Sequence, residues 1–220
     1  MLLCDDSIIN LCETEQLLTP FVRESVKTNA NSEAHVSHGP SSFGYDVRLA
    51  EEFKVFTNVF PSTEIDPLDF DKRIFQGIKA TPEGGIAVNI DGASNIQEVQ
   101  TEMKTDPRTG NKYILIPPGG FALGVTKERF KMPRNITGLV YNKSTYARCG
   151  INCYGTVIEA GWEGYLVLEF SNNTPLPARL YANQGAAQIL FVKGDKDCRV
   201  SYADRGGKYQ MQTGVQEPIV

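Results

Sequence analysis

Short apolar runs separated by turns fill residues 113–192 and limit what this chain can fold into. They fall at 113–116, 121–125, 136–141, 164–170 and 186–191. Many short strands at near-regular spacing predict an all-β sandwich, roll or barrel, and nothing here alternates a strand with a long helix. At 220 residues, we expect one domain over 1–220 with a substantial core.

The N-terminal stretch carries helix and turn signals. Residues 5–30 predict short helices, the first opening at Asp5 or Asp6 and the second ending at Pro20. The polar, turn-rich stretch 29–40 predicts a loop.

Three further stretches organise the rest of the chain. Apolar and polar residues alternate at 45–49 and 53–56, which predicts strands. Residues 79–112 are rich in Gly, Asn, Asp and Thr and predict one or two exposed β-hairpins, inserted into the domain. The polar, Gly-rich end, 204–220, predicts either a disordered tail or a flap that orders on a ligand.

Charge and cysteine content narrow the function classes. A formal net charge of -4 gives no broad electrostatic footprint for duplex nucleic acid. Five scattered cysteines argue against a disulfide framework and predict the reducing cytoplasm. Cys149 and Cys153 raise the question of zinc, but no second Cys/His pair lies near them, and His35 and His38 are far upstream. With no signal peptide and no membrane-length apolar run, we expect no membrane partner.

The segment 142–150, NKSTYARCG, follows a predicted strand and is rich in chemistry. Lys143 and Ser144 stand at the strand end, where an ammonium and backbone N–H groups can receive a phosphate. If one helical turn follows, Arg148 shares a face with Ser144. The spacing alone fits a capped turn with a surface arginine equally well.

The segment 158–172, IEAGWEGYLVLEFSN, predicts a tight turn followed by a strand. Alternation sends Leu168 and Phe170 into the core and Glu169 to the opposite face. A carboxylate in so apolar a strand needs a partner, for which Arg148 is the obvious candidate. Two readings stay open: a structural ion pair, or a carboxylate tuned to exchange protons near neutral pH.

Taken together, these segments resemble the dCTP deaminases of the trimeric dUTPase superfamily, over most of the chain. The resemblance implies a mainly β, distorted β-barrel or jelly-roll-like fold (dUTPase-like, β-clip) and a homotrimer with active sites at subunit interfaces. The motifs that carry it, in the family's order, are SSFGYDVR (41–48), EFKVFTN (52–58), IPPG (116–119), KSTYARCG (143–150), WEG (162–164), LEFSN (168–172) and DRGGKYQ (204–210).

The same resemblance implies roles for individual residues. Glu169 matches the catalytic glutamate, Ser144 the serine that holds the attacking water, and Arg148 the arginine that steadies the glutamate. Residues 203–220 match a C-terminal flap over the nucleotide. The substrate-binding positions implied are Lys143 at a phosphate, Glu159 and Trp162 near the sugar and base, and Tyr202, Lys208 and Gln212 in or near the tail.

The activity implied is hydrolysis of dCTP to dUTP and ammonia, which would supply dUTP for dUMP and dTTP synthesis. Magnesium would be coordinated by the triphosphate, with no metal ligand from protein side chains. The resemblance also suggests dTTP as a feedback inhibitor. One buried carboxylate can shuttle the protons that deamination needs. Zinc deaminases use His-x-Glu and Pro-Cys-x-x-Cys motifs, and this sequence has neither.

Four features depart from the family pattern, and the first is residues 79–112, which are longer than in compact family members and could add a partner or trimer contact. Asn142 stands where the family usually has glycine. Asparagine tolerates a positive φ better than most residues, so we expect no loss of function from this change. Gly155 makes the wall beside the base smaller, so a C5-modified dCTP is an alternative substrate. Glu159 replaces the aspartate of dUTPases, and its longer side chain displaces the carboxylate. This displacement argues against a bifunctional deaminase–dUTPase without excluding one. A dUTP diphosphatase and a non-catalytic nucleotide-binding trimer are the remaining alternatives.

Overall fold

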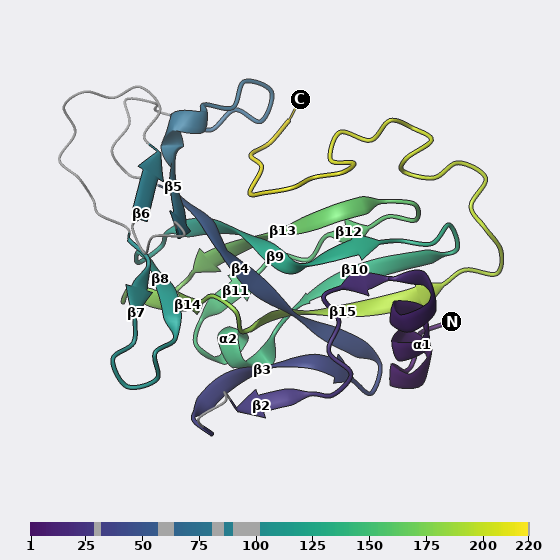
Figure 1. Cartoon of the computed structure of the whole chain (residues 1–220). Helices are drawn as coiled ribbons and strands as arrows, with labels where there is room; N and C mark the ends of the chain where they lie inside the picture. Colours follow the sequence, from purple (N-terminus) through teal and green to yellow (C-terminus); the bar gives the residue numbers. More distant parts are fainter. Residues whose placement is uncertain (29–31, 57–63, 81–85, 90–101, 220) are drawn as a thin grey trace.

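Strands dominate the architecture, which confirms the predicted mainly β fold. The computed structural model describes residues 1–28, 32–56, 64–80, 86–89 and 102–219. Within these ranges, twelve strands form one curled sheet and three form a smaller one (Figure 1). The main path through the large sheet is β11-β13-β9-β4-β15-β10-β12, and the small sheet is β14-β8-β7.

The elements follow one another in this order: α1 (Asp5–Glu15), β1 (Leu18–Thr19), β2 (Val26–Thr28), β3 (Ala34–Ser41), β4 (Gly44–Phe56), η1 (Lys72–Ile74), β5 (Phe75–Ala80), β6 (Ile86–Asn89), β7 (Lys104–Thr105), β8 (Lys112–Ile116), β9 (Phe121–Lys131), β10 (Ile136–Asn142), α2 (Ser144–Arg148), β11 (Ile151–Cys153), β12 (Val157–Ile158), β13 (Glu163–Asn172), β14 (Ala178–Tyr181) and β15 (Gly185–Lys193).

The long strand β4 gives the sheet its curl. Its first half pairs with β15, where Tyr45 lies opposite Ile189, and its second half pairs with β9. A register shift between Leu49 and Phe53 lies around the middle of the strand. Such an irregularity bends a strand and increases its twist, so β4 passes from one side of the barrel to the other.

Large apolar side chains fill the space inside this curl. Phe53, Phe130 and Phe191 are fully buried together with Leu168 and Phe170. The last two confirm the alternation predicted for β13. Burial of so much apolar surface is the main stabilising contribution to a domain of this size.

Two sequence-based expectations in the N-terminal region are wrong. A single helix, α1, replaces the two short helices, because Gln16 ends it in the left-handed conformation (φ 58°) and Leu18 then pairs with Phe130. The expected loop at 29–40 includes β3, which pairs with both β2 and β4. The conformation of such a polar segment is set by the strands with which it pairs, and local sequence propensity does not predict that pairing.

Two antiparallel pairs lie at the ends of the predicted insertion 79–112. Strands β5 and β6 pair around Ile78 and Val88, and β7 pairs with β8 between Lys104 and Tyr113. Residues 81–85 and 90–101 lie outside the described residues. The extent of this region as one insertion therefore stays a prediction.

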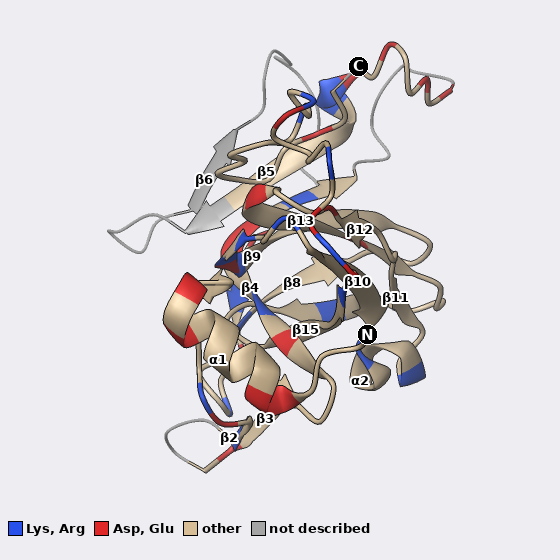
Figure 2. Ribbon diagram, turned by 90° about the vertical axis from the view of Figure 1, so that its right-hand side faces the viewer, with Lys and Arg blue, Asp and Glu red and all other residues tan. Residues whose placement is uncertain are grey.

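The C-terminal segment after β15 crosses the molecule without regular structure. In Figure 1 it runs, in yellow, from the end of β15 to the neighbourhood of β5. Figure 2 shows acidic and basic residues interspersed over most of the ribbon, with acidic ones alone on α1. None of the helices in the described ranges is long and apolar enough to cross a membrane.

Candidate active site

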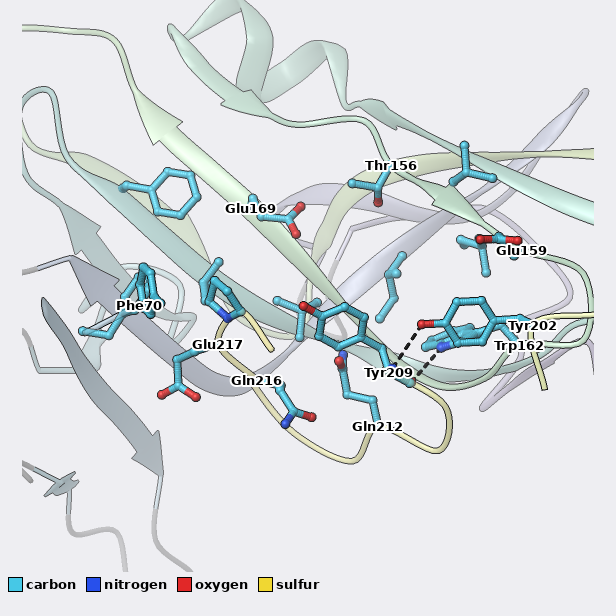
Figure 3. A pocket seen from close by; sticks show the side chains of 18 of the residues that line it. Phe70, Thr156, Glu159, Trp162, Glu169, Tyr202, Tyr209, Gln212, Gln216 and Glu217 are labelled. Atoms are coloured by element: carbon cyan, nitrogen blue, oxygen red, sulfur yellow. Dashed lines mark hydrogen bonds between the residues drawn. The ribbon is translucent and has the colours of Figure 1, made fainter. Parts of the chain in front are cut away.

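Glu169 lies in a pocket of about 670 Å³ that the inner strands and the C-terminal segment enclose together (Figure 3). Strand β13 presents it on the same face as Leu123 of β9, its direct partner in the ladder. The residues that line the pocket are Phe56, Ile65, Phe70, Phe75, Phe121, Leu123, Thr156, Val157, Ile158, Glu159, Trp162, Leu166, Val167, Glu169, Tyr202, Tyr209, Gln212, Gln216, Glu217 and Pro218.

The carboxyl group of Glu169 has an unusual environment. Burial raises its pKa from 4.5 to about 7, and a hydrogen bond from its own backbone N–H opposes part of that rise. Its Oε2 atom is buried and accepts no hydrogen bond from any described residue. A carboxyl group that titrates near neutral pH can both accept and return a proton, which is the property general acid–base chemistry needs.

Aromatic and amide groups form the wall on one side of Glu169. The Nε1–H of Trp162 donates to the backbone oxygen of Tyr209 at 2.8 Å, and the backbone N–H of Tyr209 donates to the hydroxyl of Tyr202 at 3.1 Å. Gln212 donates to the backbone oxygen of Tyr165 at 2.8 Å. Tyr202, Tyr209 and Gln212 thus reach the pocket from the chain after β15, while Trp162 reaches it from the hairpin.

The end of the tail is fastened to the sheet beyond the pocket. Val215 is buried, and its N–H donates to Oε1 of Glu52 at 3.1 Å. Glu217 forms an ion pair with Lys54, and both side chains are mostly buried. Tyr209, Gln212 and residues 216–218 thus line the pocket of their own chain. The action of the tail as a flap over a nucleotide stays a prediction.

The residues of the α2 region lie elsewhere. Ser144 and Arg148 begin and end one short helix, α2, but both are exposed and neither lines the pocket. Arg148 makes no ion pair with Glu169 within the described chain, so a single chain does not form the pair expected between them.

Lys143 is held by a residue that the sequence reasoning missed. Its Nζ lies 2.5 Å from Oδ2 of Asp46, and both side chains are about nine-tenths buried. Burial raises the pKa of the Asp46 carboxyl, and the hydrogen bond from Lys143 opposes that rise. The signal was present, because the motif at 41–48 supplies an aspartate on a predicted strand, but nothing local says that it meets position 143.

Two other predicted residues contact the tail or belong to it. Glu159 lines the pocket and forms an exposed ion pair with Arg205 of the tail. Lys208 is exposed, donates to the backbone oxygen of Ile219 at 3.3 Å and does not line the pocket. The tail thus brings Arg205 to the rim, a residue that the sequence reasoning did not single out.

The two substitutions noted in the sequence have structural explanations. A Cβ at Gly155 would stand 2.7 Å from the backbone oxygen of Val140, so close packing against β10 requires glycine there. The reading of Gly155 as extra room beside the base is therefore not what the structure favours. Asn142 lies in β10 without a positive φ, and its Nδ2 donates to the backbone oxygen of Ile151 at 3.0 Å.

Cysteines and potential metal ligands are dispersed. All five cysteines are free thiols; Cys149 is exposed and Cys153 is buried. Among the residues that the structure describes, no group of three His, Cys, Asp or Glu side chains could hold a metal ion.

Known proteins with similar sequences cover nearly the whole chain. A family described as dCTP deaminase-like matches residues 3–194. A dCTP deaminase from Azotobacter vinelandii is 45% identical over 97% of this chain and 96% of its own length. A dCTP deaminase from Leptothrix cholodnii is 43% identical over the same shares.

One solved structure confirms the type of fold. The 2'-deoxycytidine 5'-triphosphate deaminase from Agrobacterium tumefaciens matches 88% of this chain with a TM-score of 0.51 and 17% sequence identity. This chain spans about half of that protein, since the match covers 49% of it.

Proposed function

Because the chain belongs to the dCTP deaminase-like family, we propose that it hydrolyses dCTP to dUTP and ammonia. The observation that carries the proposal is Glu169: a buried carboxyl group with a pKa of about 7 and an unpartnered oxygen, facing a pocket of nucleotide size. Residues 3–194, where the family matches, include β13 and this glutamate.

The reaction follows from what one such carboxyl group can do. Ionised Glu169 takes a proton from a water molecule and passes it to N3 of cytosine, while the water oxygen bonds to C4. Glu169 then takes the proton of the new C4 hydroxyl and gives it to the amine, which leaves the tetrahedral carbon as ammonia. The C4–N bond breaks, a C4 carbonyl forms, and Glu169 returns to its ionised state. Burial keeps its pKa near the working pH, where transfer in both directions is fast.

Ser144 and Arg148 are proposed to reach Glu169 from a neighbouring copy of the chain in a homotrimer. Both are exposed and outside the pocket of their own chain. Tyr141, three residues before Ser144, is 51% exposed, which suits a surface that another subunit covers. An arginine brought in this way would favour the ionised carboxylate, and the serine would orient the water.

The triphosphate is proposed to meet basic and polar groups at the rim, with magnesium carried by the nucleotide itself. Lys143 of a neighbouring copy, held by Asp46, would contribute a fixed ammonium, and Lys208 a movable one from the tail. Trp162, Tyr202 and Gln212 form the wall against the base and sugar. A feedback inhibitor such as dTTP would use the same contacts. The free thiols suit the cytoplasm, where we place the protein.

A dUTP diphosphatase activity is the second candidate, alone or combined with deamination. It would need a carboxylate free to activate water beside the phosphate chain. Glu159 is instead engaged by Arg205. We therefore expect dUTP, and not dUMP with pyrophosphate, as the product, which chromatography of the reaction mixture would distinguish.

The decisive experiment replaces the proposed base. Glu169→Gln should lower kcat for dCTP by at least a thousandfold, because the amide cannot accept the proton of water, while dCTP binding measured by calorimetry changes little. Glu163→Gln, on the same strand and paired with Arg129, is the matched control and should stay active. Near-normal turnover by Glu169→Gln would contradict the proposal, and so would binding without any ammonia release by the unmodified chain.

A further inference from the structure

An aromatic surface continues from Glu169 across the sheet. In the ladder between β13 and β9, Ser171 lies opposite Phe121 and Glu169 opposite Leu123, so all four share one face. In the ladder between β4 and β5, Phe56 lies opposite Phe75.

The four phenylalanines of this surface pack against one another, and we call them the aromatic annex: Phe56, Phe70, Phe75 and Phe121. Phe56 and Phe75 meet edge to face with ring centroids 5.2 Å apart, and Phe121 lies 6.2 Å from Phe56. Phe70 comes from the loop before η1, and its centroid is 5.7 Å from that of Phe75.

The annex belongs to the same pocket as Glu169. Figure 3 shows Glu169 between Phe70 on one side and Trp162 and Tyr202 on the other. Glu217 also lies on the Phe70 side, but Lys54 engages its carboxylate.

Ring geometry decides which part of a bound cytosine faces the annex. In a pyrimidine nucleotide, C4 lies across the ring from N1, which carries the sugar, and C5 is the neighbour of C4. If the sugar takes the side of Trp162 and Tyr202 and C4 lies at Glu169, a substituent on C5 points away from the sugar. Phe70 of the annex lies on the other side of Glu169 from Trp162 and Tyr202, so the annex is placed to receive that substituent.

We propose that this chain deaminates cytosine deoxynucleotides that carry a small apolar group on C5, with 5-methyl-dCTP as the simplest substrate, and that the annex receives that group. The inference rests on the proposed function and names its substrate class. The step needs only water: a C4–O bond forms, the C4–N bond breaks, and 5-methyl-dCTP becomes dTTP and ammonia. The space proposed here for the C5 group lies at the annex and not at Gly155, which packs against Val140.

The test compares kcat/KM for dCTP and 5-methyl-dCTP on the full chain. Burial of one methyl group is worth about fourfold in binding, so 5-methyl-dCTP should be used as well as dCTP or up to about fourfold better. A preference for dCTP of more than tenfold would overturn this inference and leave the proposed function standing. Failure to deaminate either nucleotide would overturn the proposed function itself.

Variants of the annex locate the effect. Phe121→Trp adds bulk at the annex and should lower the ratio of 5-methyl-dCTP to dCTP turnover by roughly tenfold. Phe70→Ala, in a loop where folding is less at risk, should raise the ratio measured with 5-ethyl-dCTP. Phe43→Trp, exposed and outside the pocket, is the control and should leave both ratios unchanged. Ratios that do not respond to either annex variant would place the C5 group elsewhere and overturn the assignment.

Discussion

At the scale of single residues, Glu169 shows how a reactive group is maintained at a cost to the fold. Water would solvate its carboxylate, but the pocket removes most of that water, and no described side chain replaces it. Arg48 and Glu128 show the contrasting arrangement. Glu128 is fully buried, and both of its oxygens accept from Arg48 at 2.7 and 2.9 Å. A structural carboxylate is satisfied in this way, whereas Glu169 is not.

This difference predicts a stability effect that depends on pH. The folded pKa of Glu169 is raised from 4.5 to about 7, so its contribution is complete below pH 4.5 and is lost as pH rises to 7. Glu169→Gln escapes that loss and should stabilise the nucleotide-free protein at pH 8, with little effect at pH 4. The raised pKa alone corresponds to on the order of 3 kcal/mol, and Arg148 of a neighbouring copy, which favours the ionised carboxylate, makes the gain smaller than that. Urea unfolding at both pH values measures it, with Glu163→Gln as the control. Equal effects at pH 4 and pH 8 would contradict it.

At the scale of elements, the tail and the second half of β4 act together. The ion pair of Glu217 with Lys54 and the hydrogen bond from Val215 to Glu52 hold the tail beside the annex. Tyr209 and Gln212 precede these anchors and line the pocket. The position of the anchors therefore sets the shape of the wall.

Charge reversal at this anchor is expected to open the pocket. Lys54→Glu should raise KM for dCTP by roughly tenfold with a smaller effect on kcat, because a repelled tail no longer shapes the binding wall. The double variant Lys54→Glu with Glu217→Lys should restore much of the loss. Lys112→Glu disrupts an exposed pair with Glu51 and serves as the control. Unchanged KM and unchanged protease sensitivity of the tail in Lys54→Glu would contradict this role.

Elements also divide what the sequence could predict from what it could not. Period-two alternation was enough to place Leu168 and Phe170 inside and Glu169 on the opposite face, because that information is local. The pairing of β3 depends on which strands lie beside it. The contact of Lys143 with Asp46 and the course of the tail depend on partners 97 or more residues away in the sequence. No local pattern encodes such contacts. The expected ion pair between Arg148 and Glu169 does not form within one chain, for a different reason. Residue spacing within each segment does not tell which direction that segment faces in the folded chain.

At the scale of the whole molecule, the proposed site is complete only in an assembly. Each chain has a pocket with Glu169 and, elsewhere on its surface, an unused Ser144 and Arg148. A closed ring of copies would bring these two sets together at every interface, as cyclic symmetry requires.

Mixing inactive variants tests this arrangement. Glu169→Gln and Arg148→Ala should each be inactive alone. Refolded together, they should recover about one quarter of the original activity, the share of interfaces that join an intact glutamate to an intact arginine in a random ring. Two Glu169→Gln preparations mixed in the same way are the control. Absence of recovery, with mixed trimers verified by mass spectrometry, would show that both residues act within one chain.

Strand β4 has a consequence for communication between such sites. Near its beginning Asp46 holds Lys143, which precedes the helix proposed to serve a neighbouring chain, and near its end Lys54 anchors the tail over the chain's own pocket. One continuous strand therefore touches two catalytic centres in the proposed ring. In a trimer, three such strands would link the three sites in a ring. Movement of one tail, anchored at Lys54, would then be felt through β4 by Asp46 and by Lys143, which serves the neighbouring site. Cooperativity in such an enzyme would need no separate regulatory domain.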